Sequence, residues 1–330
     1  MTSECAETET GWSSLPEEMQ RLVVDNLGYE DRQSLAQCSK SDRALVRNCR
    51  WIFDRFDFLV NRNTKNSIEV SHRYSQDIFT QMDNGTYVER TCRSEVETIP
   101  RWKLFSIYFI DNSDFQEMAS NRLNELFKAQ NYHVHELNMD LLTVPPKFPT
   151  QISVNILQID AELRPIQPSA LFEMVSYIKP TVDWLRFRIQ HEIPRGLGAL
   201  QTVRKAKRLI FSIHSGFNGE DLMGVEGHFL DIGVSNITGN DARHFVLKRY
   251  DEGTECMFRL EMQPGFEPEF SEIATSFDEF EHVCGEDVPA EFPHCRMMHK
   301  LKKRGRDWTC YLIASSVSNF IDGGVFRDEN

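Results

Sequence analysis

The sequence lacks the features that mark secreted and membrane-spanning proteins. None of its eight cysteines forms a CxxC pair, so we expect free thiols in a reducing compartment and no disulfides. It has no run of eighteen apolar residues, the length that a membrane-spanning helix needs. The first residues carry Glu4, Glu7 and Glu9 without an apolar core, so they cannot act as a signal peptide. These absences predict a soluble protein of the cytoplasm, the nucleus or both.

Motifs of common enzymes and metal sites are also absent. There is no Gly-x-Ser-x-Gly elbow, no Walker glycine loop and no Gly-x-Gly-x-x-Gly after a strand. Hydrolase, NTPase and dinucleotide-binding functions therefore lose their usual support. Zinc-compatible side chains do cluster late in the chain, but their spacing fits no familiar finger; they are His282, Cys284, His294, Cys295 and His299. We predict no catalytic residue, no metal and no cofactor.

Positive charge is scarce. The chain has 50 acidic and 37 basic side chains and a net charge of −13, so phosphate backbones and anionic lipids are poor default partners. One basic cluster is present, and a solvated charged face explains it better than RNA binding, nuclear import or an acidic target. Its members are Lys300, Lys302, Lys303, Arg304 and Arg306.

With 330 residues and 40% apolar content, the chain can bury a large core. Short segments of two-residue alternation predict strands, and apolar residues at helical spacing predict helices over 114–129, 168–178 and 238–250, the last capped by Thr238. Strand–helix alternation favours parallel pairing. The expected strands are 105–109, 137–141, 157–159, 185–189, 209–213, 230–234 and 258–262, with a small β element around 67–71 and 86–89 and a last strand over 307–313.

The first residues of those seven strands are separated by 32, 20, 28, 24, 21 and 28 residues. These intervals overlap the leucine-rich-repeat range without settling on one period. The fold class predicted is therefore α/β, either as a degenerate leucine-rich-repeat-like stack, which we favour, or as an α/β sandwich with irregular crossovers.

Three short helices are predicted near the N-terminus, after a frayed tail over residues 1–10. Ser14 is expected to cap the first helix, with Pro16 in its first turn and Gly28 at its end. Asp31 is expected to cap the second, and Ser41 or Asp42 the third, whose buried face would include Leu45, Val46, Cys49 and Phe53.

The same region carries Leu15-Pro16-Glu17-Glu18-Met19, then Asp31-Arg32-Gln33-Ser34-Leu35 and Cys38-Ser39-Lys40. In this order and spacing the segments resemble the F-box, a three-helix domain that binds a Skp-type adaptor. About forty residues of short helices also cannot bury enough surface to be stable alone, so a partner is expected on physical grounds. The residues that the resemblance assigns to adaptor binding are Leu15, Pro16, Met19, Leu22, Val23, Leu27, Leu35, Cys38 and Leu45. The alternative is that the helices only cap the rest of the chain.

An F-box ahead of a degenerate leucine-rich-like region resembles the nematode family of F-box proteins with an F-box-associated domain. Cys38-Ser39-Lys40 and the stretch Phe229–Thr238 carry that likeness. It implies a tail over 1–10, an F-box over 11–53, a linker with a small β element over 54–100 and a substrate-binding domain over 101–330.

The resemblance implies a non-catalytic substrate receptor of an SCF-type (Skp-cullin-F-box) ubiquitin ligase. Such a receptor reaches cullin through the adaptor and brings a protein target close to the conjugating machinery, without making or breaking bonds itself. Two alternatives remain: a scaffold that uses the F-box without directing ubiquitylation, and, less favoured, an RNA-binding protein. The sequence assigns no substrate-binding residues.

Overall fold

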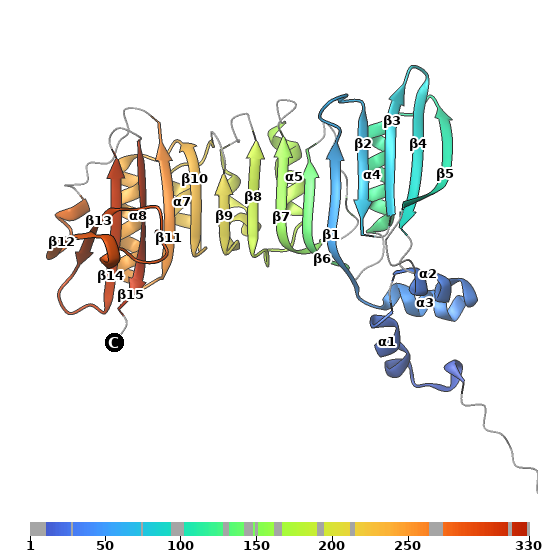
Figure 1. Ribbon diagram of the computed structural model, residues 1–330, viewed down its shortest axis with the longest axis horizontal. Coiled ribbons are helices and arrows are strands. Elements are labelled where there is room, and N and C mark those ends of the chain that lie inside the picture. The colour runs from blue at the N-terminus through green and yellow to red at the C-terminus, as the bar shows by residue number, and fades with distance from the viewer. Residues whose placement is uncertain are drawn as a thin grey trace, which may run out of the picture.

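One long, curved sheet dominates the computed structural model (Figure 1). The structure describes residues 11–27, 29–73, 75–93, 102–127, 132–141, 148, 151–161, 167–189, 195–211, 215–263, 273–315 and 319–328. Within them, fifteen strands pair in the order β12-β13-β14-β15-β11-β10-β9-β8-β7-β6-β1-β2-β3-β4-β5. No described helix is long and apolar enough to cross a membrane.

The middle of the sheet is parallel. Seven neighbouring strands run in the same direction: β1 (Trp51–Val60), β6 (Tyr132–Asp140), β7 (Ser153–Ala161), β8 (Trp184–Ile189), β9 (Arg208–Phe211), β10 (Phe229–Ser235) and β11 (Cys256–Met262). Apart from the step from β1 to β6, each is followed in the sheet by the next strand of the chain. This is the stepwise advance of a strand–crossover–strand fold.

Antiparallel strands extend the sheet on both sides. Beside β1 lie β2 (Ser67–His72), β3 (Ser75–Met82), β4 (Gly85–Arg93) and β5 (Trp102–Asp111). Beside β11 lie β15 (Phe320–Arg327), β14 (Trp308–Ser315), β13 (Met297–Lys302) and β12 (Glu279–Cys284).

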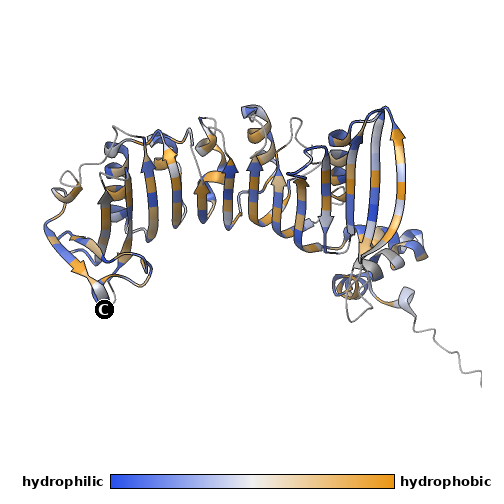
Figure 2. Cartoon of the chain, turned by 45° about the horizontal axis from the view of Figure 1, so that its top comes forward, coloured by the Kyte–Doolittle hydropathy of each residue, from blue (hydrophilic) through white to orange (hydrophobic). Residues whose placement is uncertain are grey.

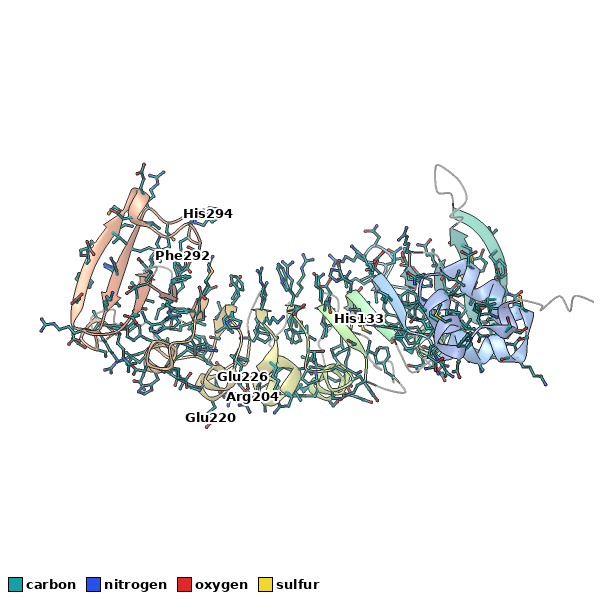
Figure 3. The ribbon with its side chains drawn as sticks, turned by 90° about the horizontal axis from the view of Figure 1, so that it is seen from below. His133, Arg204, Glu220, Glu226, Phe292 and His294 are labelled. Atoms are coloured by element: carbon teal, nitrogen blue, oxygen red, sulfur yellow. The ribbon has the colours of Figure 1, made fainter. Side chains whose placement is uncertain are left out.

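Helices cover one face of the sheet, and the other face stays open and concave (Figures 1 and 3). The helices of this region are α4 (Phe115–Leu126), α5 (Pro168–Ser176), α6 (Gln201–Lys205), α7 (Gly219–Gly224) and α8 (Gly239–Glu252), with single turns η2 (Leu197–Ala199) and η3 (Gly285–Asp287). Thr238 caps α8 in a reciprocal pair with Asp241, as the sequence predicted.

Rows of apolar side chains cross the sheet beneath the helices. Leu137, Leu157, Leu185, Leu209 and Leu230 occupy matching positions of five adjacent parallel strands, and each is fully buried. The residues between them along each strand face the open side, which gives the banded hydropathy of the strands in Figure 2. The two-residue alternation in the sequence therefore reports one buried face and one open face.

Each predicted strand has a counterpart among the described residues, although 212–213 of the segment 209–213 lie outside them, and one strand takes an unexpected place. The segment 105–109 lies in β5 at the antiparallel edge of the sheet, not in the parallel series. The chain then returns through α4 to place β6 beside β1. Strand pairing depends on contacts between residues far apart in the sequence, and the local two-residue alternation does not reveal these contacts.

One strand of the parallel series, β1, was not among the predicted strands. It begins at Trp51. The local patterns predict Phe53 on the third helix and residues 54–100 as a linker with a small β element. In the structure the described residues of that span form β1 to β4 of the main sheet. Asp54 and Arg55 are both exposed, and this break in the alternation hides the strand.

We expect His72 to make the stability of the protein depend on pH. The ring lies in β2, is 5% exposed, and contacts Phe53 and Phe56 at centroid distances of 5.1 and 5.7 Å. Its Nε2 is 2.8 Å from the hydroxyl of Ser75. Burial, assisted by Arg122, lowers the pKa of His72 from 6.5 to about 4.

Between these two pKa values the unfolded chain binds a proton that the folded chain does not. His72 therefore leaves stability intact above about pH 6.5 and removes it as the pH falls toward 4. We expect it to lower the free energy of unfolding by about 2 kcal/mol between pH 7 and pH 5. Urea unfolding of the wild type and His72→Gln at both pH values checks this. In His72→Gln the free energy of unfolding should no longer show this decrease between pH 7 and pH 5, whereas His135→Gln, an exposed control, should still show it. An equal decrease in wild type and His72→Gln would contradict the assignment.

Candidate functional site

The N-terminal helices form a small unit below the β2–β5 end of the sheet (Figure 1). It consists of η1 (Trp12–Ser14), α1 (Glu17–Asp25), α2 (Tyr29–Cys38) and α3 (Lys40–Asn48). Three helices were predicted here, but their starts differ. Pro16 is the N-cap of α1, and Ser14 lies in η1. Asp31 lies inside α2 and not at its cap, and Gly28 is outside the described residues.

Ser39, and not Ser41 or Asp42, caps α3. Its hydroxyl accepts a hydrogen bond from the Asp42 backbone N–H and donates one to the Asp42 carboxylate. Trp12 Nε1 donates to the same carboxylate at 2.7 Å. These hydrogen bonds, from Ser39 first and Trp12 second, lower the pKa of Asp42. The Asp42 carboxylate thus connects η1 to the start of α3. This contact joins residues 30 positions apart, and the sequence does not reveal it.

Arg32 fixes the end of α1 to the start of the sheet. Its guanidinium donates to the backbone carbonyls of Asp25, Leu27 and Arg50 at 2.9, 3.1 and 2.6 Å. It also lies 5.1 Å from the centre of the Trp51 ring and is 5% exposed. A buried arginine that satisfies several carbonyls supplies donors that lysine cannot match in number or direction. Arg32 therefore determines how α1 is presented, a role that its place in the motif does not disclose.

One side of α1, together with Leu15 just before the helix, presents an apolar stripe to the surface. Leu15, Met19, Leu22 and Val23 are 39%, 49%, 58% and 41% exposed. The spacing of Met19, Leu22 and Val23 places them on one face of the helix, whereas Val24 points the other way and is fully buried. Helices usually bury such a stripe, so its exposure makes it a candidate contact surface.

The predicted adaptor-binding residues fall into three groups in the structure. Exposed are Leu15, Pro16, Met19, Leu22, Val23 and Cys38. Leu27 and Leu35 are half-buried. Leu45 is 7% exposed and packs in the core with Val46 and Cys49. Its side chain therefore contributes to internal packing. The surface available to a partner is therefore centred on α1.

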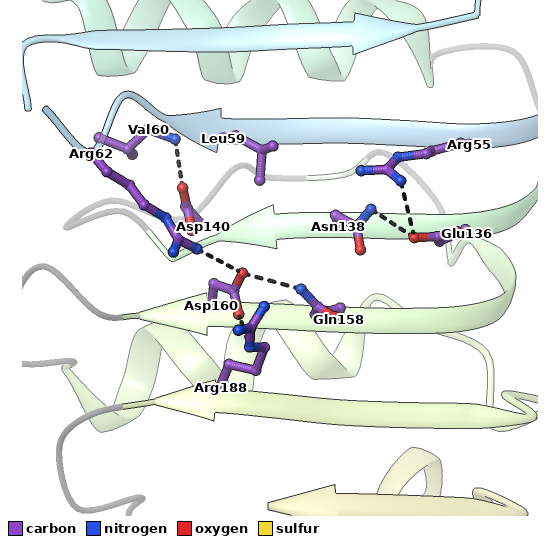
Figure 4. Close-up of a pocket in the computed structure, with 10 residues that line it drawn as sticks. All are labelled: Arg55, Leu59, Val60, Arg62, Glu136, Asn138, Asp140, Gln158, Asp160 and Arg188. Carbon is purple, nitrogen blue, oxygen red and sulfur yellow. Dashed lines mark hydrogen bonds and ion pairs between the residues drawn. The ribbon is translucent and has the colours of Figure 1, made fainter. Parts of the chain in front are cut away.

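A second candidate surface is the concave face of the sheet. A shallow pocket of about 320 Å³ lies over β1, β6, β7 and β8 (Figure 4). At its centre Asp160, which is almost fully buried, accepts hydrogen bonds from Arg62 at 3.4 Å and Gln158 at 3.2 Å, with Arg188 at 3.9 Å. At its other end Arg55 lies 3.6 Å from Glu136.

The formal charges of this pocket balance. Its lining has the arginines 55, 62 and 188 and the carboxylates of Glu136, Asp140 and Asp160. The three arginine side chains are 56%, 51% and 40% exposed, so they can exchange water for a ligand. Such a surface suits polar and charged side chains of a protein better than an apolar small molecule.

Further charges continue along the concave face. Burial raises the pKa of Asp231 on β10 and of Asp322 on β15, and Arg259 on β11 opposes the shift in both. Because β11 lies between these strands, the three side chains form an alternating row. The sequence does not show that these polar residues form one surface, because they come from separate strands.

Two sequence clusters take structural roles. In the basic cluster, Lys300, Lys302 and Lys303 form ion pairs with Glu281, Asp328 and Asp251. These ion pairs agree with the interpretation of the cluster as a charged surface and not as a nucleic-acid site. Among the His and Cys residues, His282 and His299 face each other across β12 and β13. Within the described part of the chain, no three metal-ligating side chains gather in one place.

Comparison with known proteins identifies the N-terminal unit. Residues 12–54 match the F-box domain, in agreement with the predicted span of 11–53. The match ends at residue 54, within the first four residues of β1, and covers none of the remaining sheet. Neither a curated protein nor a solved structure matches the chain. F-box domains bind Skp-type adaptors, and this domain presents its apolar stripe on α1.

Proposed function

We propose that this chain is the substrate-recognition subunit of an SCF-type ubiquitin ligase. The F-box would bind the Skp-type adaptor and, through it, cullin, while the sheet would bind a protein target. The observation that carries the proposal is the exposed stripe of α1, within a domain whose family binds such adaptors.

The target-binding part is proposed to be a degenerate leucine-rich-like, F-box-associated domain. Three features support this: the leucine row across five parallel strands, helices confined to one face, and a concave open face. Stacked repeats of this kind offer extended concave surfaces to protein partners. The mixed charges around Asp160 would provide the hydrogen bonds that fix a target's orientation.

In this role the chain contributes proximity and no bond chemistry. Binding the adaptor and the target at the same time would place the target's lysines at high effective concentration near the conjugating enzyme. We propose the cytoplasm or nucleus as its place of action, since the reducing conditions there match a chain whose described cysteines are all free thiols.

Two separation-of-function variants test this proposal. Leu22→Asp should lose the adaptor and keep the target, whereas Arg62→Ala/Arg188→Ala should keep the adaptor and lose the target. In cells, a target would be bound by both wild type and Leu22→Asp, and its half-life would be shortened by the wild type alone. Its ubiquitylation should then be reproduced with purified adaptor, cullin, conjugating enzyme and wild-type chain.

A scaffold role is the alternative, and the same experiment separates the two. A scaffold would bind the adaptor through α1 and leave the half-life of every bound protein unchanged. Failure of the wild type to bind any Skp-type adaptor would contradict both functions.

A further inference from the structure

Three arginines lie together on the concave face of the sheet, in the middle of the parallel series. Arg186 and Arg188 belong to β8 and Arg208 to β9, and neither strand contains an acidic residue. Each arginine is next to a fully buried residue of its own strand, so its side chain projects from the open face and not toward the helices. We call these three residues the arginine centre.

The protein neutralises this positive charge only in part. Among the described residues, the sole ion-pair partner of Arg188 is Asp160, at 3.9 Å, and Asp160 also pairs with Arg62 at 3.4 Å (Figure 4). Arg186 has no ion pair and no hydrogen bond within the described part of the chain, and its buried Nε lacks an acceptor there. The charge of Arg186 lowers the raised pKa of Asp231 on β10, but the two groups do not form an ion pair. A buried donor without an acceptor is unfavourable, so a bound anion would stabilise this site.

Arg208 lies beside an exposed aromatic side chain. Its guanidinium is 4.6 Å from the centre of the Trp184 ring, and it has no ion-pair partner among the described residues. Trp184 is 38% exposed and shares a row across the sheet with Ile156 and Phe229, both half-buried. An arginine stacked on an aromatic ring keeps the N–H groups at its edge free to bind a carboxylate. The arginine centre therefore has apolar side chains directly beside it.

The strands on both flanks of the arginine centre carry more carboxylates than arginines. The flanking carboxylates are Asp57, Glu136 and Asp140 on β1 and β6, and Asp231, Glu261 and Asp322 on β10, β11 and β15. A positive centre between negative flanks complements a short anionic segment whose ends are neutral or basic. A long uniform polyanion such as RNA would meet the carboxylates of both flanks, and the net charge of −13 opposes it further.

We propose that the arginine centre binds a short acidic segment of a target protein, next to a bulky apolar residue of that segment that contacts Trp184. The aspartate or glutamate side chains of the target would accept charge-assisted hydrogen bonds from Arg186, Arg188 and Arg208. This inference rests on the proposed function, because it names the class of target that the concave face recognises.

The geometry favours carboxylates over a phosphate group. Alternate residues of a strand are about 6.6 Å apart, so Arg186 and Arg188 are placed for separate carboxylates. A phosphate group binds best where several donors converge on it. Its second negative charge would also be repelled by the neighbouring Asp160 and Asp231.

Random peptides displayed on phage, selected in parallel on three full-length proteins, test the proposal. The proteins are the wild type, Arg186→Gln/Arg208→Gln, and the control Lys205→Gln/Lys248→Gln, which removes the same charge from α6 and α8 on the helix-covered face. Because the two arginines have no ion-pair partner among the described residues, their replacement leaves no carboxylate unpaired, and circular dichroism verifies each fold. Peptides with clustered Asp and Glu beside an apolar residue should be enriched by the wild type and by the lysine control, and not by the arginine variant.

A synthetic copy of the most enriched peptide makes the test quantitative. Calorimetric titration should show an affinity about 30-fold or more weaker for Arg186→Gln/Arg208→Gln, because a lost hydrogen bond between charged groups typically costs a factor of about ten or more. Replacing the acidic residues of the peptide by amides should weaken its binding to the wild type by a similar factor. The same replacement should have little effect on binding to the arginine variant, since both changes remove the same contacts. A variant that was merely misfolded would not show this dependence.

Several outcomes would overturn the proposal. These are the absence of an acidic family from the wild-type selection, an acidic family that the arginine variant also selects or that the lysine control loses, and independent losses in the titrations. Tighter binding of a peptide with phosphoserine in place of its acidic residues would also overturn it, and would assign the site to phosphate.

The same measurements keep this inference separate from the ligase function. A chain that binds a Skp-type adaptor but selects no acidic peptide would retain the proposed receptor role with another class of target. A chain that selects acidic peptides and binds no adaptor would retain the arginine centre and contradict the ligase function.

Discussion

Replacing Leu22 by aspartate is expected to abolish adaptor binding and to leave the chain folded. Leu22 is the most exposed member of the α1 stripe, at 58%, and an ionised carboxylate there would have to be desolvated at the centre of an apolar contact. We expect the dissociation constant for a Skp-type adaptor to rise by at least about 100-fold, or about 3 kcal/mol. The free energy of unfolding should change by less than about 0.5 kcal/mol, as for most surface substitutions.

Calorimetric titration of the purified chain with the adaptor measures this effect, and urea unfolding verifies the fold. Arg21→Ala is the matched control, since Arg21 lies on the same helix beside the stripe and its ion pair with Glu17 is solvent-exposed. That pair should contribute little. Wild-type affinity in Leu22→Asp would show that α1 is not the contact surface and would return the N-terminal helices to the role of a cap.

The second large effect concerns Asp77, which connects α4 to the sheet. Its side chain is 2% exposed on β3 and accepts hydrogen bonds from Arg90 of β4, at 2.7 Å, and from Arg122 of α4. Asp77→Ala would leave two largely buried guanidinium groups without this carboxylate. Removing one partner of a buried ion pair typically costs about 3–5 kcal/mol, and we expect a loss of that size in the free energy of unfolding.

Urea unfolding at pH 7 is the measurement, and Asp54→Ala is the control. Asp54 pairs with Arg73 at 3.3 Å, but both side chains are more than half exposed, so this substitution should cost less than about 1 kcal/mol. Equal effects of Asp77→Ala and Asp54→Ala would contradict the importance of the buried pair. Neither Asp77 nor its two arginine partners belong to the α1 stripe, so adaptor binding should persist wherever the variant remains folded.

Local patterns predicted the strands and helices well because each element buries one face. Two-residue alternation located β6 to β11 and apolar helical spacing located α4, α5 and α8. The caps of α1, α2 and α3 were predicted wrongly, since several serines and aspartates near each start have similar capping propensity. Tertiary contacts, such as that of Trp12 with Asp42, select among them.

Parts of both candidate surfaces were beyond any local pattern. The F-box motif named the exposed residues of α1, but it also named Leu45, which packs in the core. The motif records which residues occur together and does not separate internal packing from contact with a partner. The charged row of the concave face was missed entirely, because its residues become neighbours only when separate strands align.

The sequence by itself determined the F-box, the alternation of strands and helices, and the apolar character of the segment 104–110. These depend on residue order over short distances, where periodicity and spacing are decisive. Only the tertiary structure decided that β1 joins the parallel strands, that α1 presents its stripe outward and that β5 lies uncovered at an edge. The physical reason is the same in each case: an apolar segment can be buried or exposed, and which of these occurs depends on neighbours that long-range strand pairing brings to it.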